Sequence, residues 1–154
     1  MFTATHLHAM IVHFPIALVL VAFVSELAGL FLKKNFYSQA SLYLLILAAL
    51  GAIAAFLTGD IAGSGMDGGT LQQALSVHEQ AAAITLVLTI AAAGAKVALA
   101  FLKKEMRWLK ITAFVLLFAA AGSVARTGYL GGQLVFKHAA GVELGIGSFG
   151  ASQD

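Results

Sequence analysis

Four stretches of this sequence are apolar for long enough to cross a lipid bilayer, which takes about 20 residues of helix. They run from about residue 10 to 32, 40 to 57, 81 to 102 and 108 to 125. Leu and Ala dominate, and the runs are continuous rather than alternating, so helices satisfy the backbone better than strands. The sequence therefore predicts an all-α membrane protein, with residues 1–154 forming one transmembrane domain built as a four-helix bundle.

The composition excludes several other classes of protein. Only 10% of the 154 residues are charged, which is too little polar surface for a soluble enzyme. A formal net charge of +2 gives no basis for nucleic-acid binding. The absence of cysteine excludes disulfides, thiolate zinc sites and iron–sulfur ligation. The first span is too long for a cleaved signal peptide, and a pair of lysines follows it instead of a cleavage site.

The basic residues set the expected orientation. Six of the nine Lys and Arg residues fall in the connections after the first and third spans: Lys33, Lys34, Lys103, Lys104, Arg107 and Lys110. Only Arg126 and Lys137 fall on the opposite side. The positive-inside rule places the Lys-rich connections in the cytoplasm, so both termini face the periplasm of a bacterial inner membrane.

Two segments on the outer side are rich in glycine. They are the connection 59–69 and the C-terminal tail 132–154. Flexibility is one interpretation of these glycines, and close approach of the backbone to a ligand or a neighbour is the other. At the head of the third span, Ser76 and Glu79 have the spacing of a helix capping box.

The two halves of the chain resemble each other, which predicts two duplicated helical hairpins. Both the first and the third span end in Phe-Leu-Lys-Lys, at residues 31–34 and 101–104. In this alignment Glu26 and Lys96 match in depth, each seven residues before a lysine pair. Opposite charges at one depth offset each other's cost in hydrocarbon, so we expect these two side chains to approach each other. The alternative is that each snorkels to the nearby interface.

All five histidines fall on the expected outer side. Imidazoles from separate helices of a bundle are the usual axial ligands of haem b. Four of them are candidate ligands for one or two haems or for a metal ion: His8, His13, His78 and His138. His6 lies in the N-terminal tail, where we expect it to be solvated. The outer cations Arg126 and Lys137 can pair with haem propionates.

Other chemistry fits the same residues. With Asp60 or Glu79, the four imidazoles suit copper, zinc or non-haem iron. Protonatable groups at the outer rim also suit the binding and deprotonation of a quinol. Ordinary structural interpretations compete with these, because His13 can cap a helix that starts near Pro15 and His8 can lie at the surface. The capping box at Ser76 and Glu79 does not account for His78, and the short apolar segment before His138 can lie back on the bundle.

One segment carries a family resemblance. Residues 7–18 read Leu-His-Ala-Met-Ile-Val-His-Phe-Pro-Ile-Ala-Leu. This resembles the opening motif, His-Pro-x-x-Val-His-Phe-Pro-Ile-Ala-Leu, of a bacterial membrane-protein family known as domain of unknown function 2231. Ala9 stands where that family has proline. Further matches are Thr58-Gly59-Asp60, His78 and residues 131–138.

The resemblance covers nearly the whole chain and implies a four-helix membrane domain. Some members of the family are joined to Rieske-type or cytochrome c-type domains, which implies an electron-transfer setting. The resemblance implies that four histidines of this sequence correspond to the motif histidines of the family: His8, His13, His78 and His138. No catalytic role carries over, because the family's activity is not established.

We therefore expect a multi-pass membrane protein that binds haem b near the periplasmic face. It would pass electrons between a periplasmic redox partner and a quinone pool or a larger complex. Because all histidines lie on one side, the chain alone would not carry electrons across the whole bilayer. The competing class is a structural or assembly subunit whose histidines only form hydrogen bonds. A transporter ranks last, since the spans contain few polar groups.

Overall fold

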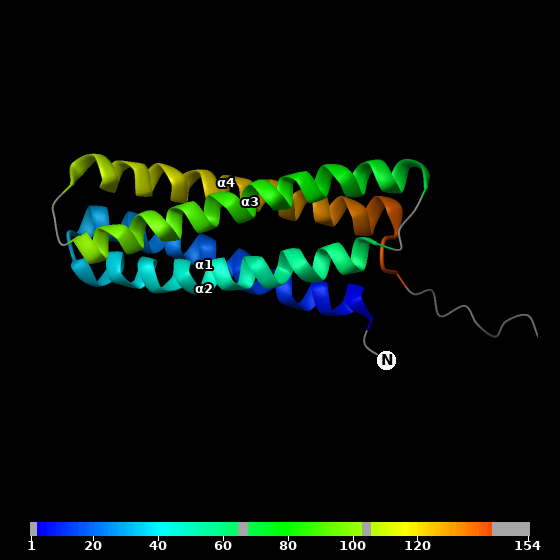
Figure 1. Cartoon of the computed structure of the whole chain (residues 1–154), viewed down its shortest axis with the longest axis horizontal. Coiled ribbons are helices and arrows are strands. Elements are labelled where there is room, and N and C mark those ends of the chain that lie inside the picture. Colours follow the sequence, from blue (N-terminus) through cyan, green and yellow to red (C-terminus); the bar gives the residue numbers. More distant parts are fainter. Residues whose placement is uncertain (1–2, 65–67, 103–105, 143–154) are drawn as a thin grey trace, which may run out of the picture.

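The computed structural model describes residues 3–64, 68–102 and 106–142. Four long helices make up nearly all of this part: α1 (Ala4–Leu32), α2 (Asn35–Gly63), α3 (Gly69–Leu102) and α4 (Arg107–His138). They run alternately in opposite directions as one elongated bundle (Figure 1). Each is long and apolar enough to cross a membrane. The predicted all-α class and the four spanning helices are confirmed.

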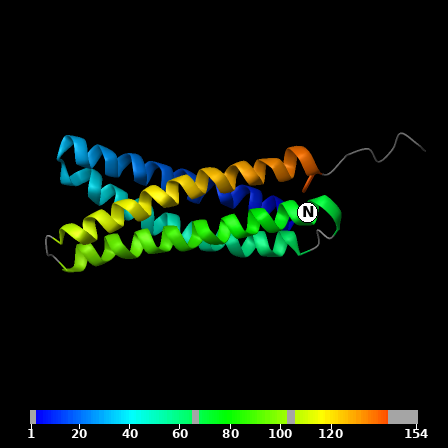
Figure 2. The same ribbon diagram turned by 90° about the horizontal axis from the view of Figure 1, so that it is seen from above.

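The helices are arranged as two hairpins. α1 packs on α2 and α3 packs on α4, while α2–α3 and α1–α4 contacts join the hairpins. α1 and α3 therefore lie on one diagonal of the bundle (Figure 2). The start of α1 and the end of α4 lie at the same end, as the hairpin prediction requires (Figure 1).

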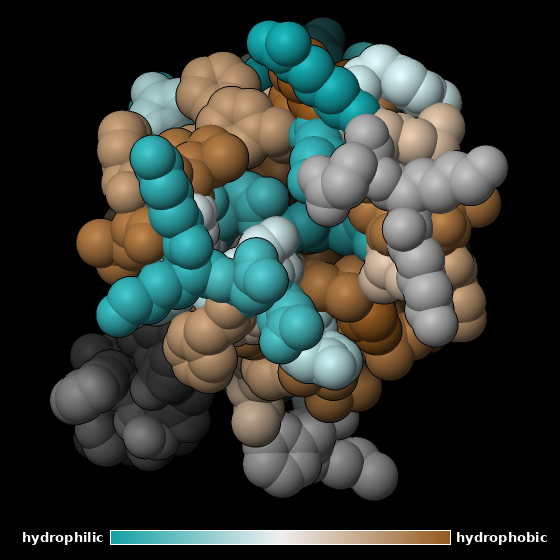
Figure 3. Space-filling view, turned by 90° about the vertical axis from the view of Figure 1, so that its left-hand side faces the viewer, coloured by the Kyte–Doolittle hydropathy of each residue, from teal (hydrophilic) through white to brown (hydrophobic). Residues whose placement is uncertain are grey.

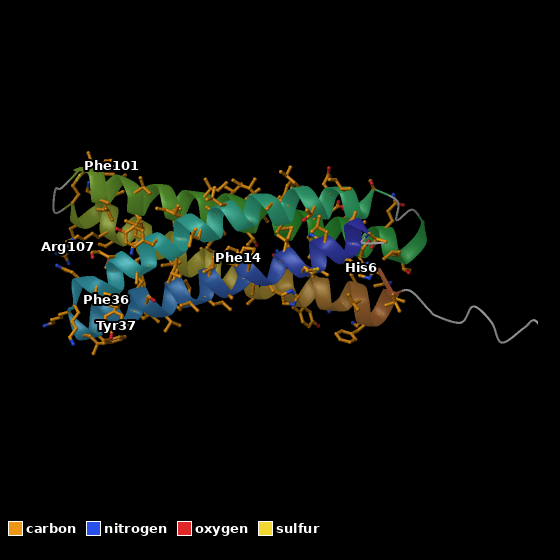
Figure 4. The ribbon with its side chains drawn as sticks, turned by 90° about the horizontal axis from the view of Figure 1, so that it is seen from below. His6, Phe14, Phe36, Tyr37, Phe101 and Arg107 are labelled. Carbon is orange, nitrogen blue, oxygen red and sulfur yellow. The ribbon has the colours of Figure 1, made fainter. Side chains whose placement is uncertain are left out.

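The two ends of the bundle differ in their side chains. We call the end with Lys33, Lys34 and Arg107 the lysine end, and the opposite end, where α1 and α3 begin, the histidine end. Seen end-on, the lysine end presents hydrophilic side chains between apolar flanks (Figure 3). Phe36, Tyr37, Phe101 and Arg107 lie there, whereas His6 lies at the other end and is exposed, as expected (Figure 4).

The helices are longer than the expected spans. α2 continues to Gly63 and α4 to His138, so the described part of the 59–69 connection is largely helical, as is the beginning of the 132–154 tail. α3 begins at Gly69, which places Ser76 and Glu79 inside the helix, so the predicted capping box is wrong. Hydropathy marks only a membrane-length stretch, but a helix satisfies its own backbone and continues beyond the hydrocarbon.

Small side chains fill the interior. Ala22, Leu45, Ala92 and Leu117 are 0% exposed, whereas most large apolar side chains lie on the outside of the bundle. This distribution suits helices packing in lipid, where close approach replaces a hydrophobic driving force. Aromatic contact adds to it, since the ring of Phe23 lies 5.8 Å from that of Phe118 between their centroids.

Pro15 lies well inside α1 and is buried, so the helix does not start at His13 as one interpretation had it. Its ring packs against Gly51 of α2. A Cβ atom on Gly51 would lie 3.0 Å from Phe14 and 3.3 Å from Pro15, which is tighter than an ordinary contact. Close packing of α1 on α2 at this level therefore depends on glycine.

We expect Gly51→Val to destabilise the bundle by about 1–3 kcal/mol, because the added side chain must push α1 away from α2. Thermal unfolding in detergent measures the effect. Gly94→Val is the matched control, because nothing lies within 4 Å of a Cβ at that position. Equal melting temperatures for the two variants would contradict this account of the α1–α2 contact.

The predicted approach of Glu26 and Lys96 is confirmed. The Lys96 ammonium on α3 donates a hydrogen bond to the Glu26 carboxylate on α1 and forms an ion pair with it. Both side chains turn into the bundle rather than towards the interface, with exposures of 6% for Lys96 and 16% for Glu26. The pair therefore connects the two hairpins across the diagonal of the bundle.

Candidate cofactor site

A cavity of about 550 Å³ lies inside the histidine end of the bundle. All four helices contribute to its wall, and its volume is in the range typical of small-molecule sites. Most of the lining is aliphatic or small, with side chains such as Ile16, Val19, Leu86 and Leu134. An apolar ligand with a few polar atoms fits such a lining.

His8 reaches the cavity from α1, and α2 fixes its ring. Its Nδ1 lies 3.0 Å from the carbonyl oxygen of Ala55 and 3.3 Å from the hydroxyl of Thr58. Because a carbonyl only accepts, Nδ1 carries the proton in the neutral ring and Nε2 is left as the acceptor. Metal-binding histidines are usually held in this way by a hydrogen bond from the second ring nitrogen.

His78 reaches the same cavity from α3, on the opposite corner of the bundle. Its Nδ1 is buried and has no hydrogen-bond partner among the residues that the structure describes. The backbone of Thr127 lies near the ring but outside hydrogen-bond geometry. Since Nδ1 is closed off by protein atoms, Nε2 is the nitrogen of this ring that a ligand in the cavity could reach.

Glycines make room for both imidazoles. A Cβ on Gly59 of α2 would lie 2.9 Å from Cε1 of His8, and one on Gly131 of α4 would lie 3.2 Å from Cε1 of His78. Each ring therefore occupies space that a side chain on its own hairpin partner would fill. The matching placement agrees with the predicted equivalence of the two hairpins.

We expect Gly131→Ala to displace the ring of His78, because the new methyl group would come closer to it than ordinary contact allows. Gly128→Ala on the same helix is the control, since a Cβ there has nothing within 4 Å. Histidine resonances in NMR spectra of the two variants measure the difference. Unchanged His78 resonances in the Gly131 variant would show that the glycine does not set the position of the ring.

The structure does not bring all the candidate ligands together. His13 touches the edge of the cavity, but its ring is exposed and its Nδ1 lies 2.6 Å from the Ala9 carbonyl of the same helix. His138, Arg126 and Lys137 do not line the cavity. Within 3–64, 68–102 and 106–142, no three histidine or acidic side chains converge as a group that could hold a metal ion.

Comparison with known proteins places the chain in a family. A family model described as "Predicted membrane protein (DUF2231)" matches residues 4–144. The chain belongs to this family. No match was found among curated proteins or solved structures. Family membership agrees with the four apolar helices, and the resemblance inferred from the sequence is confirmed for this DUF2231 domain.

The DUF2231 domain also contains a cluster of hydroxyl groups that was not predicted from the sequence. Thr85 of α3 donates to its own helix, at the Ala81 carbonyl, and its oxygen lies 2.7 Å from that of Ser123 and 2.8 Å from that of Thr127, both on α4. Thr89 is fully buried one turn further along α3. The signal was present in the sequence, since His78, Thr85 and Thr89 recur at the spacing of one helix face.

The cavity also has an acidic rim. Asp60 and Glu79 line it, and no Lys or Arg in the described part of the DUF2231 domain does so. The side chain of Glu79 extends from α3 to α2. A Cβ atom on Gly63 of α2 would lie 3.1 Å from the Oε1 atom of Glu79. The site therefore combines an apolar interior and two imidazoles with a rim that favours neutral or positively charged groups.

Proposed function

We propose that the cavity is a redox cofactor site in which His8 and His78 would hold one haem b. The observation that carries this proposal is that two imidazoles from diagonal helices line one apolar cavity, each with Nε2 as the ring nitrogen left open to a ligand. Helix bundles hold haem in this manner, with the porphyrin in the interior. When bound, the haem would supply reversible one-electron chemistry at its iron.

The protein's own residues would orient and shield the cofactor. The hydrogen bond from His8 to the Ala55 carbonyl leaves Nε2 free to bind and fixes the plane of the ring. The glycines beside the imidazoles give both rings room against the helix backbone. The aliphatic wall excludes water, and a low dielectric around a haem is one of the means by which proteins set its potential.

The acidic rim supports a second candidate, a neutral quinol. Haem propionates are anionic, and Asp60 and Glu79 repel them, so they would have to extend past the rim to water. A quinol has no such conflict. Its ring hydroxyl would donate a hydrogen bond to Nε2 of His8, which would accept the proton while the electron passes to a periplasmic redox protein.

We further propose that the lysine end faces the cytoplasm and the histidine end the periplasm of a bacterial inner membrane, following the basic residues. The electron donor or acceptor would then be a periplasmic protein of cytochrome c or Rieske type. Because the cavity lies at one end only, electrons would leave towards the quinone pool or a neighbouring subunit on the same side.

The absorption spectrum of the purified full-length chain tests the haem proposal. We expect a Soret band, an α-band on reduction and about one haem per chain, since two imidazoles serve one iron. A colourless protein with bound quinone would favour the second candidate. A colourless protein with stoichiometric copper, zinc or iron would favour a metal site, and one with no ligand would favour a structural subunit; both outcomes would overturn the haem proposal.

A further inference from the structure

A buried polar cluster lies near the lysine end, away from the cavity. The Lys96 ammonium donates to the Glu26 carboxylate and also to the carbonyl and the hydroxyl oxygen of Ser38, at 3.2 and 3.4 Å. All three of its N–H groups therefore have an acceptor. Charged side chains within a membrane span are costly and typically mark ion pathways or proton relays.

The next polar atom towards the cavity is the hydroxyl of Ser41. This residue lies one helical turn beyond Ser38 on α2, is 0% exposed, and has no hydrogen-bond partner for its oxygen in the described part of the chain. On the other side of the ion pair, Glu26 is the more exposed partner. The cluster thus has a polar atom buried on its inner side and a partly accessible carboxylate.

The inner face of α3 extends the polar groups towards the histidine end. His78, Thr85, Thr89 and Lys96 follow one another at spacings of seven, four and seven residues, which keeps them on one side of the helix. From His78 to Lys96 this stripe covers about 27 Å, close to the thickness of the hydrocarbon. The cavity lies at one end of the stripe and the ion pair at the other.

One apolar layer interrupts the stripe. Ala22, Leu45, Ala92 and Leu117 come from all four helices, are fully buried and pack together between Thr89 and Lys96. Two polar compartments are therefore separated by a single layer of aliphatic side chains. Seven residues, or about 10 Å of helix, separate Thr89 from Lys96, so a proton path needs a transient chain of water molecules across this layer.

We propose that Glu26 and Lys96 form a proton-exchange site on a path along α3 between the lysine end and the cavity. Lys96 releases one proton towards Ser41, and Glu26 takes up one proton from the lysine end, which leaves a neutral amine beside a neutral acid. Transfer of the proton from Glu26 to Lys96 then restores the ion pair. One proton enters for each one that leaves, and the site has no net charge at either stage, as a low dielectric favours.

Proton flux into lipid vesicles tests the proposal. Vesicles containing the full-length chain and a pH-sensitive dye are given a potassium diffusion potential with valinomycin, and the initial rate of pH change is measured. We expect a rate above that of protein-free vesicles. Lys96→Arg should reduce the protein-dependent rate by about tenfold or more, since a guanidinium keeps the ion pair but does not release its proton.

Two further variants separate proton exchange from folding. Lys34→Arg makes the same chemical change at an exposed position of the lysine end and should leave the rate unchanged. The double variant Glu26→Gln/Lys96→Gln removes both titrating groups while keeping hydrogen-bonding side chains, and should also lose the flux. If the arginine variant does not fold, the flux of this double variant tests the proposal in its place. Wild-type vesicles no faster than empty ones, or a folded Lys96 variant as fast as wild type, would overturn the proposal. The test needs no ligand in the cavity.

Discussion

Replacing His78 with alanine is expected to abolish haem binding, with a fall in affinity of about 100-fold or more, because an axial ligand is worth more than its supporting hydrogen bonds. His8→Ala should have the same effect, since the two rings face one cavity from opposite corners of the bundle. Titration of the apoprotein with haem, followed at the Soret band, gives the affinities directly.

The other histidines supply the controls for this prediction. His13→Ala should leave the spectrum nearly unchanged, because that ring is exposed and bonded to its own helix. His138→Ala should do the same, because His138 does not line the cavity. A spectrum that depends on His13 or His138 but not on His78 would contradict the assignment, and would move the site outside the cavity.

The second large effect is expected at the ion pair between the hairpins. Lys96→Met leaves the half-buried Glu26 carboxylate without its partner, which should cost about 3 kcal/mol of unfolding free energy. The double variant Glu26→Leu/Lys96→Met should recover most of that loss, because replacing a buried ion pair by apolar side chains is often neutral. Reversible unfolding of the chain in mixed micelles by increasing denaturing detergent measures both values.

The comparison between single and double variants makes this result interpretable. Strong recovery in the double variant indicates that the loss comes from an unpaired charge rather than from altered packing. A single variant that loses less than about 1 kcal/mol would mean that the remaining carboxylate reaches water, as in the snorkelling alternative. That outcome would contradict the burial of Glu26 seen in the bundle.

Much of the architecture could be predicted from the sequence. The four apolar stretches and the repeated Phe-Leu-Lys-Lys segments indicate two hairpins, and the shared distance from the lysine pairs matches Glu26 with Lys96 in depth. These inferences succeed because hydropathy and depth are properties of a single helix in a membrane. They fail at the helix ends, since a helix outside the hydrocarbon has no hydropathic signature.

The choice among the histidines depends on how each helix is rotated about its axis. His13 follows His8 by five residues, and at about 100° per residue the two side chains point about 140° apart, so only one can face the interior. The packing of α1 on α2 at Pro15 and Gly51 selects His8. Likewise, the sequence does not show that Gly59 and Gly131 leave room for the two rings. That requires knowing which residues of α1 face α2 and which residues of α3 face α4.

Because the helices extend beyond the hydrocarbon, the cavity and the ion pair should respond differently to the membrane potential. His8 lies 24 residues from the end of α1 at Leu32, or about 36 Å, whereas the hydrocarbon is about 30 Å thick. With the hydrocarbon beginning near the lysine end, His8 lies beyond its far boundary, whereas the cavity floor at Val19, about 20 Å from Leu32, lies inside it. An electron that stops at the level of His8 therefore crosses little of the electric field, and the midpoint potential of a cofactor held at that level should barely respond to membrane polarisation. A charge moving past Lys96 and through the apolar layer would cross most of that field, and its movement would be driven by about 2.3 kcal/mol per 100 mV.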